Sequence, residues 1–274
     1  MAIDNMPQVM VGTNGLSYET LCGDIDALVP ETEIVAIDCA PSYGTEERIG
    51  KAVHRNMERY GTKRGKFFLQ TKLDAVDQLA GRVEEAFERS LARMQVDYLD
   101  SYVMHWPNPT TFVKDWATMI SLKKSGRVRH IGVCNFRMRH WKQLIDSAPE
   151  ELPEINQIEM HPLNTCDEML SYCTSMGVKL QAYTSLCKML PPISKNKQLE
   201  DMSDKYGCSI SELVLAWHVT RGVAPITKSS KPERLRKNVL SSLSLKISSE
   251  DMKAITSLNQ NYRFFLESTG CPGF

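Results

Sequence analysis

Four polar residues in the first half of this 274-residue sequence have side chains that could together protonate a carbonyl oxygen. Asp38, Lys72 and His105 each stand at the end of a short apolar run, and Tyr43 follows the first of these runs. Tyrosine has an unperturbed pKa of about 10, but a nearby ammonium stabilises the phenolate and lowers that pKa. We therefore expect Lys72 to lower the pKa of Tyr43, and Asp38 to hold Lys72 in place and charged.

His105 completes a set suited to protonating a developing alkoxide, because a neutral histidine can orient a carbonyl oxygen by donating a hydrogen bond. A second agent must then deliver a hydride. Each residue alone has a simpler explanation: an Asp at a strand end often caps a helix, and a lone Lys or His there is more often solvated than catalytic. Their occurrence on three successive runs favours a shared site.

Eight short apolar runs favour β-strands, and stretches with helical periodicity lie between them. The runs are 8–11, 33–38, 67–71, 99–104, 129–133, 154–159, 178–183 and 223–227. One predicted helical face consists of Val83, Ala86, Phe87, Leu91 and Met94. The long gap before the last run holds two helical stretches, 197–206 and 211–220, and Ser209 is placed to cap the second.

This alternation predicts a parallel (β/α)8 (TIM) barrel, whose usual size is about 250 residues. No Pro-, Gly- or Ser-rich linker divides the chain, so we expect one α/β domain over residues 1–274. A doubly wound open sheet is the competing topology, but it normally has GxGxxG after its first strand, and GTNGL at 12–16 lacks that pattern. In a barrel the carboxyl ends of the strands form one mouth, where we expect the four polar residues to meet.

Charge and hydropathy exclude several classes of partner. The 33 basic residues equal the 33 acidic ones, so nothing in the net charge favours a nucleic acid or an anionic membrane. The apolar runs are too short to span a bilayer, and the N-terminal MAIDNMPQVMVG lacks the basic start of a signal peptide. We expect a cytoplasmic monomer whose partner is a small molecule.

The eight cysteines include no CxxC pair, and the six histidines form no HxH or HExxH pattern. We therefore expect reduced thiols, no disulfide and no metal site. Cys39 and Cys134, at predicted strand ends, should be buried or partly shielded, and Cys271 near the end of the sequence should be the most reactive.

The sequence resembles the aldo-keto reductase superfamily along nearly its whole length. AIDCAPSYGTEERIG, FLQTKL and YVMHWPNP resemble the family motifs that carry the catalytic tetrad, here Asp38, Tyr43, Lys72 and His105. GRVRHIGVCNF, INQIEMHP, QAYTSL and ITKSSKPERLRKN follow in the family's order. The short loops are similar to those of bacterial and plant aldehyde or keto-sugar reductases.

The resemblance implies a reductase that uses a nicotinamide cofactor, normally NADPH, with neither a Rossmann domain nor a metal. It implies that Asn135 and Gln157 bind the carboxamide, Tyr183 stacks on the ring, and Lys228, Ser229 and Arg234 surround the 2′-phosphate. The full set of implied cofactor contacts is Gly12, Thr13, Cys134, Asn135, Gln157, Tyr183, Thr184, Ser185, Leu186, Lys228, Ser229, Ser230, Arg234 and Asn238. Asn14 and Trp106 are the implied substrate-pocket residues.

The phosphate site also has a general structural reason, since barrels often bind phosphate at the loop after the eighth strand and the start of a short extra helix. We expect Ser230 to cap that helix and Pro232 to lie in its first turn. A solvated basic helix face is the alternative interpretation of this segment.

Five residues depart from the family pattern. Asn14 stands where many members have Trp, Cys134 where Ser accompanies the Asn, and Thr227 where Pro precedes the cofactor lysine. Lys231 adds a charge near the 2′-phosphate, and Lys237 stands where an acidic residue often meets the adenine.

The predicted function is NADPH-dependent reduction of aldehydes or ketones, with Tyr43 as proton donor. The alternative is a cofactor-binding regulatory protein with little turnover, of the kind that the potassium-channel β subunits resemble; a structural role like that of lens crystallins has less support. The loop after His105 and the segment beyond Arg263 are short, which suggests an open site. Small aldehydes, dicarbonyls, keto sugars and a bulky ketone all remain open as substrates.

Overall fold

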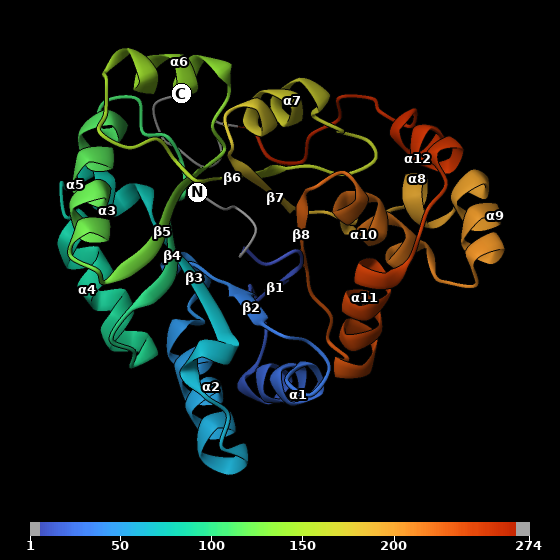
Figure 1. Ribbon diagram of the computed structural model, residues 1–274, viewed down its shortest axis with the longest axis horizontal. Helices are drawn as coiled ribbons and strands as arrows, with labels where there is room; N and C mark the ends of the chain where they lie inside the picture. The colour runs from blue at the N-terminus through green and yellow to red at the C-terminus, as the bar shows by residue number, and fades with distance from the viewer. Residues whose placement is uncertain (1–5, 267–274) are drawn as a thin grey trace.

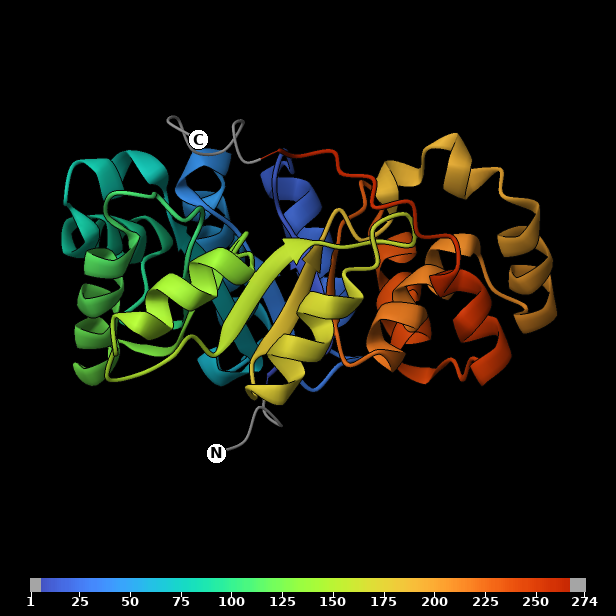
Figure 2. The same cartoon turned by 90° about the horizontal axis from the view of Figure 1, so that it is seen from above.

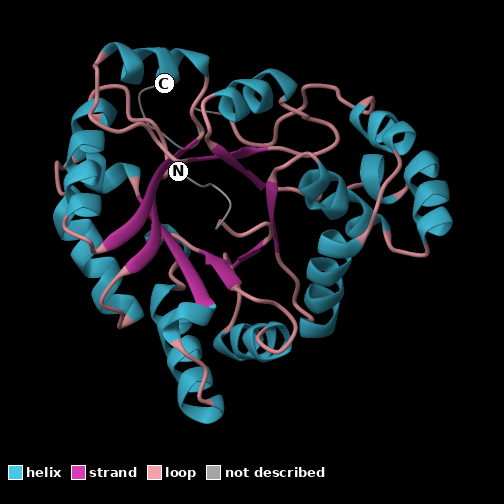
Figure 3. Cartoon of the chain, in the orientation of Figure 1, coloured by secondary structure: helices cyan, strands magenta, loops and turns pink. Residues whose placement is uncertain are grey.

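Eight parallel strands close into a barrel in chain order, each paired with its neighbours in sequence and β1 paired with β8 (Figure 3). The computed structural model describes residues 6–266. The strands are β1 (Met10–Gly12), β2 (Val35–Asp38), β3 (Phe67–Leu73), β4 (Leu99–Met104), β5 (Val128–Cys134), β6 (Ile155–Glu159), β7 (Lys179–Tyr183) and β8 (Ala224–Thr227). The predicted (β/α)8 fold and all eight predicted strands are confirmed.

Helices surround the strands on the outside, and α8, α9 and α12 lie beyond α10 and α11 at the right of Figure 1. The α-helices are α1 (Tyr18–Leu28), α2 (Glu46–Tyr60), α3 (Ala75–Leu79), α4 (Val83–Met94), α5 (Phe112–Lys124), α6 (Met138–Asp146), α7 (Asp167–Ser175), α8 (Pro191–Ser194), α9 (Lys197–Tyr206), α10 (Ile210–Thr220), α11 (Pro232–Ser244) and α12 (Ser249–Thr256). Short 3₁₀ helices are η2 (Pro41–Tyr43), η3 (Arg64–Lys66) and η4 (Cys187–Met189).

Local sequence signals explain two of these helices. The five apolar residues predicted to share one face of α4 are all buried. Ser209 caps α10 as expected: its hydroxyl accepts a hydrogen bond from the backbone N–H of Glu212, and the Glu212 carboxylate accepts one from the Ser209 backbone. This reciprocal capping box satisfies two backbone donors that a helix start otherwise leaves unpaired.

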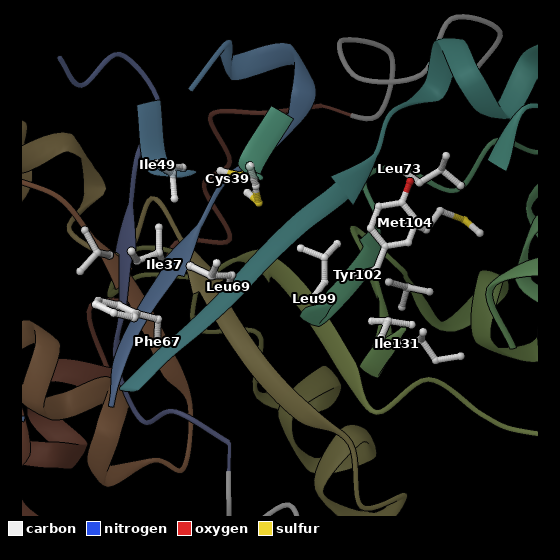
Figure 4. Close-up of a cluster of buried hydrophobic side chains, with 14 of the residues drawn as sticks. Ile37, Cys39, Ile49, Phe67, Leu69, Leu73, Leu99, Tyr102, Met104 and Ile131 are labelled. Carbon is white, nitrogen blue, oxygen red and sulfur yellow. The ribbon is translucent and has the colours of Figure 1, made fainter. Parts of the chain in front are cut away.

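The largest apolar cluster lies between the outer faces of the strands and the surrounding helices. Figure 4 shows Ile37, Leu69 and Tyr102 from three strands within this cluster. Phe87 of α4 packs edge-on against Tyr102, with ring centroids 5.2 Å apart. This packing fixes the helices against the barrel and holds the strand ends in register.

The barrel interior near the carboxyl ends is polar instead. Gln70, Gln157 and Gln181 form a buried hydrogen-bonded layer. Gln70 and Gln157 each donate an amide N–H to Oδ1 of Asp38, at 2.8 and 3.0 Å. Buried polar groups are costly unless paired, so this mutual pairing explains how the layer is tolerated and fixes the Asp38 carboxylate in one orientation.

Among residues 6–266, no helix is both long and apolar enough to cross a membrane. The seven cysteines in this range have free thiols, and Cys39 and Cys134 are buried as predicted. Cys271 lies outside the described residues. Within that range, no group of three or more His, Cys, Asp or Glu side chains is arranged to hold a metal ion.

Candidate active site

The four predicted catalytic residues meet at the carboxyl end of the barrel. Asp38 ends β2, Lys72 lies near the end of β3, His105 follows β4, and Tyr43 ends η2. The Lys72 Nζ lies 2.8 and 2.9 Å from the two Asp38 carboxylate oxygens and 3.4 Å from the Tyr43 hydroxyl. The Tyr43 and His105 rings meet edge to face with centroids 5.9 Å apart.

Lys72 is completely buried, and its ammonium is fully engaged. Besides Asp38 and Tyr43, its Nζ donates to the backbone carbonyl of Cys39 at 2.8 Å. Burial by itself would lower the pKa of Lys72, but the Asp38 carboxylate outweighs it and holds that pKa above its usual value. Lys72 is therefore a permanent cation, held by Asp38 as expected.

The expectation that Tyr43 has a lowered pKa beside Lys72 is wrong. Burial raises the pKa of Tyr43 to about 12, although the charge of Lys72 acts to lower it. Desolvation of the phenolate outweighs a single ammonium that is itself neutralised by Asp38. Tyr43 consequently keeps its proton at neutral pH, and Lys72 orients the hydroxyl without ionising it.

His105 has a partner that the sequence analysis missed. Its Nδ1 lies 2.5 Å from Oδ1 of Asp74, the residue that directly follows β3. Burial lowers the pKa of His105, although the hydrogen bond to Asp74 acts to raise it. The one sequence signal for Asp74 was its position two residues after Lys72 at the same strand end.

A cavity of about 750 Å³ opens over these residues. Its lining includes three of the tetrad residues and most of the implied cofactor and substrate contacts. These are Asp38, Tyr43, His105, Gly12, Thr13, Asn14, Trp106, Asn135, Gln157, Tyr183, Thr184, Ser185, Leu186 and Lys228. Lys188, Met189, Ile226, Thr227 and Phe265 also line it and were not predicted.

Some implied contacts lie elsewhere. Cys134 is buried in a cluster with Val103 and Ile155, and it does not line the cavity. Asn238 is buried within α11. Ser229 and Ser230, in the loop after β8, and Arg234 of α11 are likewise absent from the cavity lining.

One wall of the cavity is held by a chain of hydrogen bonds. The Tyr183 hydroxyl donates to Oδ1 of Asn135 at 2.8 Å, and the Asn135 amide donates to the His105 carbonyl at 3.0 Å. Asn135 has a φ of 63°, in the left-handed region that Asn tolerates better than most residues. These bonds fix the side chain of Asn135 directly beside His105.

The loop after β8 gathers the implied phosphate ligands at the start of α11. The Ser229 hydroxyl accepts from Arg234 Nε at 2.9 Å and from the Lys231 backbone at 3.0 Å, and Lys228 Nζ donates to the Asn14 carbonyl at 2.7 Å. Pro232 opens α11 as predicted, but Lys231 is the N-cap and Ser230 is not. The Ser229 hydroxyl bonds Lys231 and Arg234, and no side chain caps the helix.

The loop after β7 is strained where it borders the cavity. Thr184, Cys187, Lys188 and Met189 have φ values of 53°, 54°, 53° and 51°. Non-glycine residues in this region cost on the order of 1 kcal/mol or more each, and such strain gathers at ligand sites.

The C-terminal segment forms part of the cavity wall. The carboxylate of Glu159, at the end of β6, accepts the backbone N–H groups of Phe264 and Phe265 at 2.6 and 2.9 Å. Phe265 then packs edge-on against Tyr183 at 5.8 Å between centroids. Figure 2 shows this red segment running across the upper end of the barrel. The expected open site is therefore walled on this side in spite of the short segment.

The cavity and the adjoining start of α11 together suit a phosphorylated nicotinamide dinucleotide. Lys228 lines the cavity, and beyond it the N–H groups at the start of α11, which no side chain caps, lie near the guanidinium of Arg234, a favourable place for a phosphate. Within the cavity, the amide side chains of Asn135 and Gln157 lie with Asp38, Tyr43 and His105. The length between them is lined by Ser185, Leu186 and other residues of the loop after β7.

Comparison with known proteins gives one consistent result. The model of the aldo/keto reductase family matches residues 8–260. The chain is 35% identical over 228 residues to the glyoxal reductase of Bacillus subtilis, covering 83% of this chain and 80% of the relative. It is 33% identical over 260 residues to the methylglyoxal reductase DkgA of Escherichia coli, covering 94% and 91%. A crystal structure of a Bombyx mori aldo-keto reductase in complex with NADP superposes with a TM-score of 0.88 at 27% identity, covering 96% of this chain and 92% of that one.

Proposed function

The chain belongs to the aldo/keto reductase family and is an NADPH-dependent oxidoreductase, and we propose that it reduces small dicarbonyls and aldehydes to alcohols with Tyr43 as proton donor. The observation that carries this proposal is the contact of Lys72 Nζ with both Asp38 and the Tyr43 hydroxyl. We propose that the whole activity resides in one barrel domain spanning residues 1–274.

Three of the tetrad residues have roles that follow from their contacts. Tyr43 holds a proton on Oη at neutral pH because burial raises its pKa to about 12. Lys72 orients that hydroxyl and stabilises the phenolate left behind, and Asp38 keeps Lys72 charged. A bound NADPH supplies the hydride that reaches the carbonyl carbon. A positioned proton donor contributes roughly 10²–10⁴ in rate.

We assign cofactor recognition to residues that line the cavity and to Arg234 at the start of α11. We propose that Asn135 and Gln157 bind the carboxamide, Tyr183 stacks on the nicotinamide ring, and Lys228 and Arg234 bind the 2′-phosphate. The Ser229 hydroxyl bonds Arg234 Nε at 2.9 Å, which supports this role because it holds the guanidinium at the start of α11.

The substrate class rests on the relatives and on the cavity wall. Two relatives are named as glyoxal and methylglyoxal reductases, which act on compact dicarbonyls. Trp106 and Phe265 line the cavity with apolar surface beside His105 and Tyr43. These two rings bound the space beside His105 and Tyr43, which favours a small carbonyl over a bulky ketone.

We also propose that the protein is a cytoplasmic monomer with no nucleic-acid or membrane partner. The equal numbers of basic and acidic residues support the absence of a nucleic-acid or membrane partner. The regulatory alternative has no support beyond the fold, since the complete tetrad is needed only for turnover.

The decisive test is steady-state oxidation of NADPH with methylglyoxal, glyoxal, a keto sugar and a bulky aromatic ketone. We expect turnover with the first two at the highest kcat/KM. Tight NADPH binding without turnover of any carbonyl would favour the regulatory alternative instead.

A further inference from the structure

Asp74 links the catalytic histidine to the turn that carries the proton donor. Its Oδ1 lies 2.5 Å from His105 Nδ1, and its Oδ2 accepts the backbone N–H of Ser42 at 2.8 Å. Ser42 directly precedes Tyr43 in η2. The Asp74 and His105 side chains are 13% and 17% exposed, so water competes little for this pair.

The position of the proton on His105 follows from this contact. A carboxylate has no proton to donate, so a ring nitrogen 2.5 Å from it must carry the hydrogen. A neutral imidazole has only one N–H, and its other nitrogen is an acceptor. In the neutral ring Nδ1–H therefore faces Asp74, and Nε2 offers a lone pair. Within the described residues no hydrogen bond engages Nε2, and His105 lines the cavity.

We propose that Asp74 is a positioning residue that makes the hydrogen bond from His105 to a substrate carbonyl conditional on uptake of one proton by the Asp74–His105 pair. With one proton the pair presents a lone pair at Nε2, which accepts from an alcohol hydroxyl. With a second proton, taken from solvent, Nε2 bears N–H and donates to a carbonyl oxygen. Tyr43 still transfers the proton to the product, so the pair only orients the oxygen. This inference rests on the proposed carbonyl reduction.

Because of the groups around it, His105 takes up this second proton only at acidic pH. His105 faces Lys72 of β3, Asp38 of β2, Tyr43 of η2 and Asp74 after β3. Burial and the Lys72 ammonium disfavour an imidazolium, whereas the two carboxylates favour it. The net effect holds the pKa of His105 below its usual value. The donating form is consequently gained as the pH falls and lost as the pH rises.

Asp74→Asn separates the two functions of the carboxylate. An Asn in the same place can accept the Ser42 N–H through Oδ1 and donate its amide N–H to His105 Nδ1. The neutral ring then carries its hydrogen on Nε2 and donates at any pH. Asp146→Asn, which removes an exposed carboxylate on α6, is the matched control.

The first measurement uses no cofactor. In ¹⁵N-labelled protein, long-range imidazole spectra report which nitrogen of each histidine is protonated, and His105→Gln identifies the His105 signals. At about pH 8 we expect Nδ1–H in the parent and Nε2–H in Asp74→Asn. An Nε2–H tautomer in the parent at that pH would overturn the inference without any variant being needed.

The second measurement is the pH profile of NADPH-dependent reduction. In the parent and in Asp146→Asn, kcat/KM should fall about tenfold per pH unit above the apparent pKa of the Asp74–His105 pair. The fall should end at the rate that Tyr43 supports without a hydrogen bond from His105 to the carbonyl. In Asp74→Asn that fall should disappear. An identical slope in Asp74→Asn and the parent contradicts the role of Asp74. Absence of turnover in the parent at every pH contradicts the proposed function instead, and the spectra still test Asp74.

Discussion

At the scale of single residues, burial and charge act on Tyr43 in opposite directions. The Lys72 ammonium favours the phenolate, but loss of water around the hydroxyl costs more, so the pKa of Tyr43 rises to about 12. The group is a poor acid in the resting site and gives up its proton only when a stronger base, a developing alkoxide, contacts it. Lys72 then stabilises the phenolate that forms.

Replacing Tyr43 by Phe removes the proton and keeps the ring. We expect carbonyl reduction to fall by roughly 10²–10⁴ because a positioned acid contributes about that much. Quenching of tryptophan fluorescence by NADPH should give an unchanged Kd. A Tyr43→Phe enzyme that kept half the parent rate would show that another group supplies the proton.

Arg234 should decide between NADPH and NADH. Hydrogen bonds to a charged group contribute roughly 1.5–3 kcal/mol each, so two that form only with the 2′-phosphate favour NADPH by about 3–6 kcal/mol before desolvation. We expect a preference of about thirtyfold or more after that discount. Arg234→Ala should weaken NADPH binding and leave NADH binding nearly unchanged.

The matched control is Arg236→Ala, because Arg236 lies on the same helix and pairs with Glu31. It should change neither dissociation constant. Equal constants for the two cofactors in the parent would mean that this segment is only a solvated basic helix face.

At the scale of elements, the shape of the site depends on loop segments that hydrogen bonds hold at the ends of the strands. Glu159 is buried and accepts two backbone N–H groups from Phe264 and Phe265 as well as a bond from His161. Burial alone would raise the pKa of Glu159, but these donors lower it, so it stays ionised. One carboxylate thereby holds the backbone of Phe265, which lines the cavity.

In the parent, the two carboxylate oxygens of Glu159 accept the hydrogen bonds from Phe264, Phe265 and His161. Glu159→Gln leaves a single acceptor oxygen for these donors. We expect the C-terminal segment to loosen and the KM for a small carbonyl to rise about tenfold, equivalent to about 1.4 kcal/mol, with little change in the Kd for NADPH. Phe265→Ala should raise KM in the same way. An unchanged KM in both variants would show that this wall does not contact the substrate.

The backbone just after α6 is strained at a position outside the cavity. Ala148 is exposed and has a φ of 50°, a conformation that costs a residue with a Cβ about 1 kcal/mol. Ala148→Gly should stabilise the fold by about that amount and raise Tm by roughly 2 °C. Ala117→Gly, at an exposed position inside α5, should lower Tm instead, because glycine costs a helix interior about 1 kcal/mol. Equal shifts in both variants would contradict the argument.

At the scale of the whole molecule, one buried carboxyl makes folding stability depend on pH. Asp24 of α1 is 1% exposed, and neither carboxylate oxygen has a hydrogen-bond partner among the described residues. Burial raises the pKa of Asp24 to about 7. The native state therefore favours the protonated form, and its stability falls as the pH rises from the unfolded pKa of about 4 toward 7.

Asp24→Asn removes the charge at nearly constant volume. Relative to the parent, its free energy of unfolding should grow by about 1.4 kcal/mol per pH unit between those two pKa values. Urea denaturation at two pH values, one near each end of that interval, measures the difference. A stability difference independent of pH would show that Asp24 is ionised in the native state at both values.

The sequence by itself determined the barrel, the tetrad and most of the cavity lining. Strand runs and helical faces are local periodicities, and catalytic residues at strand ends follow from the register of a parallel barrel. Asp38, Lys72 and His105 could therefore be assigned to one mouth before any contact was known. Tyr43 was added because it follows the run that ends in Asp38, and the family resemblance implied the residues that contact the cofactor.

Only the tertiary structure decided how those groups behave. The pKa of Tyr43 depends on all the atoms that displace water around its hydroxyl. The spacing of residues in the sequence does not show how many such atoms there are. The bond between Asp74 and His105 joins residues 31 apart, and that between Glu159 and Phe264 joins residues 105 apart. The N-cap of α11 is Lys231 and not Ser230, and it is the Ser229 hydroxyl that accepts hydrogen bonds from the Lys231 backbone and Arg234. Such pairings form only when the strand ends converge, because chain order does not specify which side chains a closed barrel brings within hydrogen-bonding distance.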